Sequence, residues 1–138
     1  MKQIDLGNET EREIAKFFNE NKYWSFIIPK SFAGQPFDII ARRENFTWFI
    51  DAKHLESSKI SFPFDRIEPN QITSMNYAYH IANIKERIGF VIWWERDYSS
   101  HFYLSWDKYL KMIEKGLKSV RIEELERLEE ILPNEYNN

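Results

Sequence analysis

Residues 34–54 read GQPFDIIARRENFTWFIDAKH and form two largely apolar segments joined by a short Glu-Asn turn. Two such segments around a two-residue turn are typical of a β-hairpin. Each segment nevertheless carries an aspartate, Asp38 in the first and Asp51 in the second, and Lys53 follows two residues after Asp51. Charged side chains are rarely buried in a strand without a compensating partner, so this hairpin predicts a functional site as well as a fold.

Strand periodicity predicts where these charges point. Successive side chains of a strand alternate between its faces, so Asp51 and Lys53 share one face. Pairing across the short turn brings Asp38 beside Asp51 on that face. Two adjacent carboxylates repel, which raises the pKa of one of them unless a cation intervenes. A divalent cation such as Mg²⁺, which takes oxygen ligands from one or two carboxylates, would offset this repulsion better than Lys53 alone.

Two predicted helices add polar residues to the same place. Glu11 leads the apolar stripe of a helix expected over about residues 8–21, so its carboxylate is directed toward the sheet. Gln71 stands at the head of the apolar stripe of a second helix, expected over about residues 69–84. The sequence therefore predicts that Glu11 and Gln71 converge on the two aspartates.

The remaining pattern predicts an α/β fold in which a mixed central β-sheet is flanked by helices. The chain of 138 residues has the length of a single domain, covering residues 1–138. The expected order is αβββαββαα. The expected strands are 23–28, 37–43, 46–54, 87–95 and 101–106, and the later helices are 107–115 and an acidic C-terminal helix at about 122–132.

Composition excludes several classes of protein. A hydrophobic content of 43% with 17% aromatic residues indicates a folded globular chain. No run approaches the 18 or so apolar residues of a membrane helix, and the polar start of the chain lacks a secretory signal, so we expect a cytoplasmic protein. The absence of cysteine removes disulfides, thiolate zinc sites and cysteine nucleophiles.

The net charge of −3 is unevenly distributed. The segment after residue 121 holds six glutamates and one arginine, which leaves 18 basic against 16 acidic residues in the first 121. The low overall charge therefore weakens a nucleic-acid function without excluding one.

The spacing of Asp38, Asp51 and Lys53 resembles the PD-(D/E)xK nuclease superfamily. The context resembles its Holliday-junction resolvases, of RecU type or archaeal and phage Hjc-like, through GNETEREIAKFF (7–18), KSFAGQPFDII (30–40) and FPFDRIEPNQITSM (62–75). The chain departs from that pattern at Leu6, where a basic residue is usual, at Asp51, which replaces the commoner glutamate, and in a short 30–36 loop where RecU proteins have a long stalk.

The resemblance implies a restriction-endonuclease-like core and a Mg²⁺-dependent endodeoxyribonuclease, with Mn²⁺ as a substitute. Such an enzyme would act in DNA recombination and repair as a homodimer that resolves four-way DNA junctions by paired symmetrical nicks. The residues with implied roles are, for catalysis, Glu11, Asp38, Asp51, Lys53 and Gln71; for the metal, Glu11, Asp38, Asp51 and the Ala52 carbonyl; and for DNA phosphates, Lys30, Ser31, Arg42, Arg43 and Lys59.

Several alternatives stay open at this point. The chain could be another nuclease of the superfamily, such as a restriction or phage DNA-processing enzyme, or a catalytically idle DNA-binding module of the same fold. Asp51 and Lys53 could form a surface ion pair, Glu11 could stabilise a helix dipole, and Gln71 could simply cap its helix.

Overall fold

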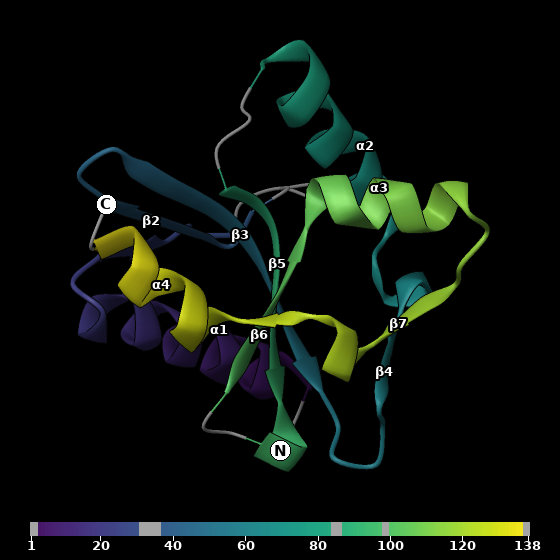
Figure 1. Ribbon diagram of the computed structural model, residues 1–138, viewed down its shortest axis with the longest axis horizontal. Coiled ribbons are helices and arrows are strands. Elements are labelled where there is room, and N and C mark those ends of the chain that lie inside the picture. Colours follow the sequence, from purple (N-terminus) through teal and green to yellow (C-terminus); the bar gives the residue numbers. More distant parts are fainter. Residues whose placement is uncertain (1–2, 31–36, 84–86, 98–99, 137–138) are drawn as a thin grey trace.

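A computed structural model describes residues 3–30, 37–83, 87–97 and 100–136 (Figure 1). The elements of regular structure are α1 Gln3–Glu20, β1 Trp24–Ile27, β2 Ile39–Arg43, β3 Phe46–Leu55, β4 Ser61–Pro63, a 3₁₀ turn Phe64–Arg66, α2 Pro69–Asn76, a π-helical turn Tyr77–Ile81, β5 Arg87–Trp94, a 3₁₀ turn Glu95–Asp97, β6 His101–Ser105, α3 Trp106–Glu114, β7 Ser119–Arg121, a 3₁₀ turn Ile122–Glu124, β8 Glu126–Arg127 and α4 Leu128–Tyr136.

The central sheet has six strands in the order β1-β2-β3-β5-β6-β8. Only the β3–β5 pair is parallel, and α2 lies in the crossover between them, while the other neighbours are antiparallel. The mixed sheet flanked by helices is therefore confirmed. A separate two-stranded sheet pairs β4 with β7. Among the described residues, no helix is long and apolar enough to cross a bilayer.

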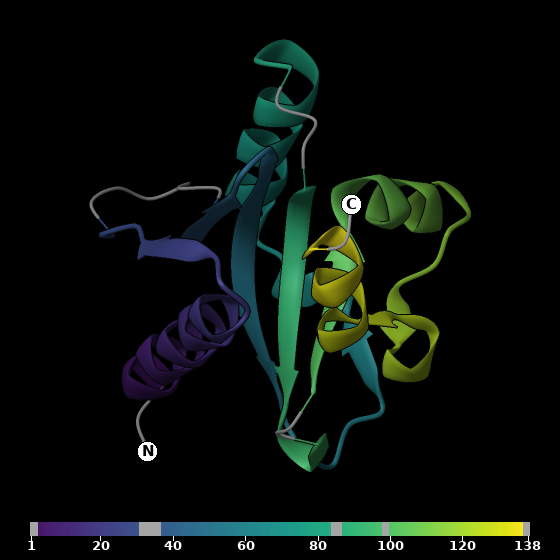
Figure 2. The ribbon, with the colours of Figure 1, turned by 60° about the vertical axis from the view of Figure 1, so that its left-hand side comes forward.

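Strand alternation divides the buried side chains into two clusters on opposite faces of the sheet. In β3, Trp48 and Ile50 belong to the cluster that includes residues of α1 and α4, whereas Leu55 belongs to the one that includes residues of α2 and α3. In β5, Val91 faces the first cluster and Phe90 the second. Figure 2 shows α1 and α3 on opposite sides of the sheet.

The predicted hairpin is confirmed in register. Arg43 pairs with Phe46, so the turn contains two residues, and Glu44 takes a positive φ of 50° there. Primed hairpin turns require this left-handed conformation, because it matches the twist of the flanking strands.

Other boundaries were predicted wrongly. The first helix begins at Gln3, ahead of the expected residue 8, because Thr10 bonds back to the Leu6 carbonyl at 2.8 Å instead of starting the helix. The segment at 122–132 is not one helix: it forms a 3₁₀ turn and β8 before α4 begins at Leu128. The short strands β4, β7 and β8 were not predicted.

The hairpin strands differ in length, and this difference makes room for a site. β3 has ten residues and β2 only five. Main-chain pairing between them ends where the Asp38 amide donates to the Ile50 carbonyl at 2.8 Å. Beyond that point β3 continues from Asp51 to Leu55 with β5 as its strand partner. Among the described residues, no second strand therefore pairs with this edge of β3 at the aspartates, and α1 supplies Gly7 and Glu11 there.

Candidate active site

A pocket of about 380 Å³ occupies the opening beside the end of β2. It brings together all five side chains predicted for catalysis, together with Ala52 and Lys30. Its lining residues are Gly7, Glu11, Lys30, Asp38, Asp51, Ala52, Lys53, Glu68, Asn70 and Gln71. Four separate segments contribute the carboxylates, the lysine and the amide: α1, the residue just before β2, β3 and α2.

Asp38 and Asp51 form a close carboxylate pair at the centre of this pocket. The Asp38 side chain replaces the missing main-chain partner of β3, since its Oδ2 accepts a hydrogen bond from the Ala52 amide at 2.8 Å. Burial, repulsion from Asp51 and a hydrogen bond with Asp51 together raise the pKa of Asp38 to about 7. In the absence of a cation the pair therefore holds a proton near neutral pH.

Lys53 and Gln71 surround Asp51. The Lys53 ammonium lies 3.0 Å from Asp51 Oδ2 and donates to Gln71 Oε1 at 3.1 Å. The Gln71 amide in turn donates to Asp51 Oδ1 at 2.8 Å. Gln71 also caps α2, because its Oε1 accepts from the Glu68 amide at 3.3 Å. The side chain thus both caps its helix and bridges the lysine and aspartate, which are only 13% and 2% exposed.

Glu11 reaches the pocket from α1 but is held by a cation of the chain itself. Its carboxylate is 7% exposed and lies 2.6 Å from the ammonium of Lys30, which is 58% exposed. Burial raises the pKa of Glu11, the Lys30 contact lowers it, and the charge of Asp38 raises it further. The hydrogen bond to Glu11 raises the pKa of Lys30 and so favours its charged form, whereas burial opposes the negative charge of Glu11.

The residues present fit a hard divalent cation. Asp51 Oδ2 is fully buried, and apart from its ion pair with Lys53 at 3.0 Å it has no hydrogen-bond partner among the described residues. The carboxylates of Asp38 and Asp51 and the neighbouring Ala52 carbonyl are oxygen donors of the kind that Mg²⁺ prefers. Within the described ranges no three Asp, Glu or His side chains are already spaced as a ligand set. The geometry therefore offers two carboxylates at the core, with Glu11 engaged by Lys30.

The residues predicted to contact phosphates are dispersed. Lys30 lines the pocket, and Ser31 lies outside the described residues. Arg42 and Arg43 are at the turn end of the hairpin, four and five residues along β2 from Asp38. Lys59, in the loop after β3, is not among the described residues that line the pocket, and its carbonyl accepts the Trp94 indole N–H at 2.9 Å.

The sequence did not identify Arg66 as part of the site. Its guanidinium donates to the His54 carbonyl of β3, and its own carbonyl accepts a long bond of 3.5 Å from Lys53. Burial lowers the pKa of Arg66, and the acidic groups around it, Glu56 first, raise it. Arg66 therefore ties the 3₁₀ turn before α2 to the strand that carries Asp51 and Lys53. The FPFDRIEPNQITSM stretch contains it, but strand or helix periodicity gives no signal in a 3₁₀ turn.

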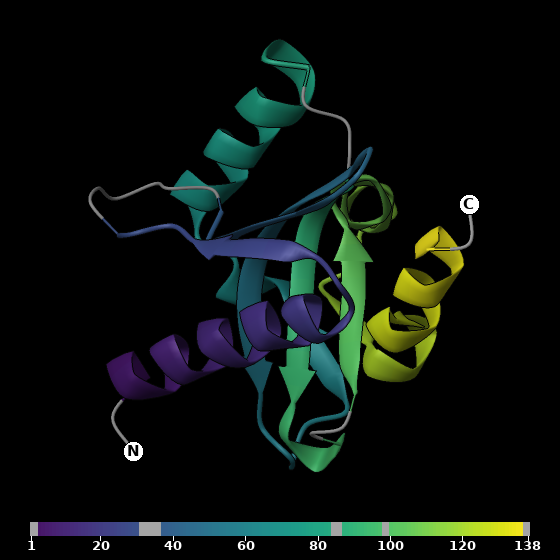
Figure 3. The same ribbon diagram turned by 90° about the vertical axis from the view of Figure 1, so that its left-hand side faces the viewer.

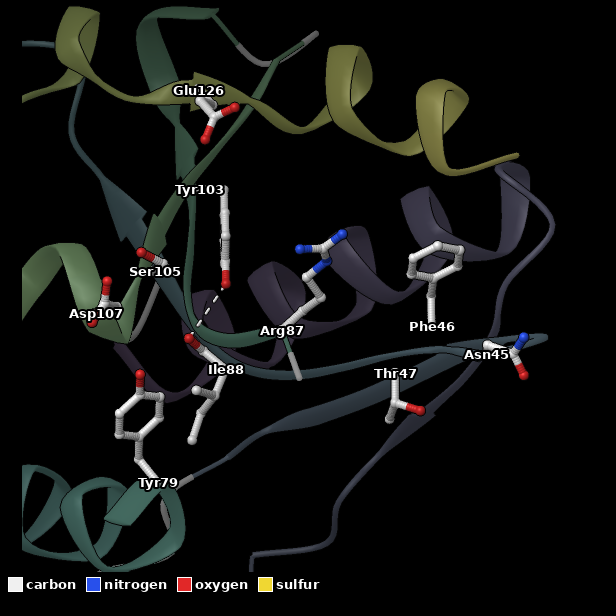
Figure 4. Close-up of a pocket in the computed structure, with 10 residues that line it drawn as sticks. All are labelled: Asn45, Phe46, Thr47, Tyr79, Arg87, Ile88, Tyr103, Ser105, Asp107 and Glu126. Carbon is white, nitrogen blue, oxygen red and sulfur yellow. Dashed lines mark hydrogen bonds between the residues drawn. The ribbon is translucent and has the colours of Figure 1, made fainter. Parts of the chain in front are cut away.

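A larger pocket of about 580 Å³ lies elsewhere, at the start of β3 and β5 (Figure 4). It mixes a cation, aromatic rings and two separate acids, namely Arg87, Phe46, Tyr79, Tyr103, Asp107 and Glu126. Arg87 lies over the Phe46 and Trp48 rings, each with its centroid 5.7 Å from the guanidinium carbon. Figure 4 shows the Tyr103 hydroxyl directed at the Ile88 carbonyl. It lacks the close carboxylate pair of the smaller pocket, so volume does not identify the chemical site.

The fold is similar to that of a solved nuclease. The structure superposes on Hjc from Archaeoglobus fulgidus, described as a Holliday junction resolvase from an archaeal hyperthermophile, with a TM-score of 0.64 and 12% sequence identity. The match covers 92% of this chain and 95% of the other. No protein-family model matches the chain, and no curated protein sequence does. The predicted Hjc-like fold is therefore confirmed; at this identity the likeness shows the fold alone.

Proposed function

We propose that the chain is a metal-dependent DNA endonuclease that acts on four-way junctions. The observation that carries the proposal is the close Asp38–Asp51 pair, with Asp51 buried and Asp38 partly buried and with Lys53 and Gln71 around it, in one pocket of an Hjc-like fold. A structural ion pair would not require a second, partly buried carboxylate beside the first, because that arrangement costs stability. In a site that binds a cation and a phosphate, the cation offsets the repulsion between the two carboxylates.

Each residue has a proposed role in phosphodiester hydrolysis. Asp38, Asp51 and the Ala52 carbonyl would hold Mg²⁺, which supplies a more acidic water and positive charge opposite the scissile phosphate. Lys53, fixed by Gln71, would orient the attacking water and stabilise the developing negative charge. Glu11 would accept a hydrogen bond from water at the edge of the site once Lys30 turns to a phosphate. The Lys30 side chain is 58% exposed, so it has room to make that turn.

Paired nicks require two such sites, and we propose a homodimer. The helix α2 and the turn that follows it project from the body of the molecule (Figure 3). On this projection Tyr77 and Ile81 are 58% and 70% exposed, four residues apart on one side of the helical segment. A second copy that covered these side chains would remove apolar surface from water. Sedimentation of Ile81→Asp tests this contact: a dimeric wild type and a monomeric variant are expected, and a monomeric wild type would exclude the dimer.

Cleavage of matched DNA substrates tests the function. A four-way junction and a linear duplex of the same sequence would be incubated with the chain in Mg²⁺ and in EDTA. Symmetrical paired nicks in the junction alone, lost in EDTA, are expected. Equal cutting of both substrates would indicate a general nuclease of the superfamily. Binding of the junction without cleavage would indicate a catalytically idle binding module.

Asp51→Asn provides the residue-level test. The variant keeps the shape of the site but removes a charge, so cleavage should fall by a factor of about 10² or more while junction binding persists. Asp107→Asn is the matched control, since Asp107 is a 55% exposed aspartate on α3 paired with Lys111. Near-normal cutting by Asp51→Asn would contradict the assigned site.

A further inference from the structure

The edge strand β1 exposes a pair of parallel aromatic rings. Trp24 is 64% and Phe26 46% exposed, although both are large apolar side chains. Their ring centroids lie 6.1 Å apart and their planes are only 3° from parallel. Adjacent exposed aromatics on one face are a feature of binding surfaces, because leaving them in water otherwise weakens folding.

These rings lie on the face of the sheet that carries the two aspartates. In β2, Ile39 and Ala41 are fully buried against the α1 side, so Ile40 and the flanking Asp38 and Arg42 belong to the opposite face. Phe26 pairs with Ile40 and Trp24 with Arg42. Paired residues of neighbouring strands share a face, which places both rings on the Asp38 side.

The register also fixes their separation from the site. Phe26 is the diagonal neighbour of Asp38, and such neighbours are about 7–8 Å apart between Cα atoms. Trp24 lies two residues further along β1, about 7 Å more. Stacked nucleotides advance about 3.4 Å each along a strand. Phe26 and Trp24 are therefore about two and four nucleotides from a phosphate bound at the aspartates.

A cation accompanies the rings. Arg42 is exposed and stands directly across from Trp24 in the register. Its Nη1 donates to Thr47 Oγ1 at 2.5 Å, which fixes the side chain on this face. The guanidinium carries five N–H groups, so it can bind a phosphate at the same time. Aromatic rings beside a cation are a feature of proteins that bind single-stranded nucleic acid.

We propose that Trp24 and Phe26 are a stacking platform for unpaired bases of the DNA strand that enters the candidate active site, with Arg42 on a phosphate of that strand. The inference rests on the proposed nuclease function and adds a substrate feature to it, which is a strand whose bases beside the branch point are unpaired when the DNA is bound. Bases inside an intact duplex are stacked on each other, so they cannot offer a face to these rings. Arg42 beside the rings favours nucleic acid over a second copy, for which the apolar Tyr77 and Ile81 pair offers a surface.

Fluorescence of a base analogue tests the platform directly. Asp51→Asn would be used as the background so that the DNA is not cut. A forked DNA with 2-aminopurine at each of the first four unpaired positions would be compared with a fully paired duplex. Stacking on a ring should quench the analogue in the fork, and the double change Trp24→Ala with Phe26→Ala should abolish the quenching and weaken fork binding about tenfold or more. Duplex binding should change less than about threefold by the same reasoning.

Two further variants complete the design. Ile60→Ala with Leu117→Ala removes two other side chains of similar exposure, 49% and 47%, and should leave quenching intact. Trp24→Phe keeps a ring and should retain most of the fork affinity. Unchanged quenching and affinity in the double alanine variant would overturn the platform, as would loss of a dimer in that variant without loss of quenching. Failure of the unaltered chain to cut any branched DNA would instead contradict the proposed nuclease function, whatever the aromatic variants do.

Discussion

Replacing Asp38 by asparagine should stabilise the metal-free protein. The folded-state pKa of Asp38 is raised from 3.8 to about 7, so folding opposes ionisation of this carboxyl. At about 1.36 kcal/mol per pKa unit, the shift corresponds to about 4 kcal/mol of destabilisation above pH 7. Asp38 is partly exposed, and solvent screening reduces this value to an expected gain of about 2 kcal/mol for the variant. In a domain of this size that gain is about 6–10 °C in Tm.

The pH dependence of the stability difference shows whether ionisation of Asp38 causes it. A carboxyl with a raised pKa costs no stability below its unfolded value of 3.8, and the cost grows as the pH rises to about 7. Thermal melts of wild type and Asp38→Asn should therefore converge near pH 4 and separate fully by pH 8. Asparagine can keep the 2.8 Å bond from the Ala52 amide through its own oxygen, so the packing is retained.

Added Mg²⁺ should stabilise wild type more than it stabilises the variant. At ten times its dissociation constant, a cation bound by the folded state alone stabilises by about 1.4 kcal/mol, and wild type should gain this while Asp38→Asn gains little. Asp65→Asn, a change at an exposed residue of the 3₁₀ turn, is the control and should melt like wild type. A variant at position 38 that melts at or below the wild-type temperature at pH 8 would refute the argument from repulsion.

Three other changes have defined outcomes. Gln71→Ala removes the 3.1 Å and 2.8 Å bonds that fix the lysine and aspartate beside it, and should lower kcat for junction cleavage about tenfold, with a stability loss near 1 kcal/mol from the lost cap. Gly89→Ala places a Cβ 2.4 Å from the Leu104 carbonyl oxygen in the neighbouring strand, and urea unfolding should show a loss of about 3 kcal/mol or more, or no folded protein. Burial lowers the pKa of His101 to about 4, so stability should fall by up to about 3 kcal/mol as the pH drops from 6.5 to 4, and His101→Phe should remove that fall in the difference between the two melting curves.

The parts of the fold that the sequence predicted are those with strong local signals. The hairpin has strict alternation and a two-residue turn, and the structure has the expected pairing of Arg43 with Phe46. β5 is an apolar run bounded by polar residues, and both of its faces are buried. The short strands β4, β7 and β8 have two or three residues each, too few to show a period, and they exist only because distant segments pair with them.

The sequence predicted which residues form the candidate site, but not the contacts between them. Alternation placed Asp51 and Lys53 on one face, and helical spacing directed Glu11 inward. No local sequence pattern indicates that Asp38 accepts a hydrogen bond from the Ala52 amide or that Lys30 pairs with Glu11. The same holds for the contact by which Arg66 ties its turn to β3. These contacts depend on where one strand ends and another continues, which is a property of the assembled sheet.

That difference in strand length also explains why the repelling carboxylates are tolerated. If β2 continued in register past Asp38, a main-chain carbonyl would meet the Ala52 amide and an extended strand would fill the space before Asp51. Because β2 stops, the Asp38 carboxylate satisfies that amide, and the described residues around it line a pocket. Lys53 offsets part of the charge from one side and Lys30 from another. A divalent cation entering this opening would complete the neutralisation, so the same opening that weakens the sheet provides the access that metal and phosphate need.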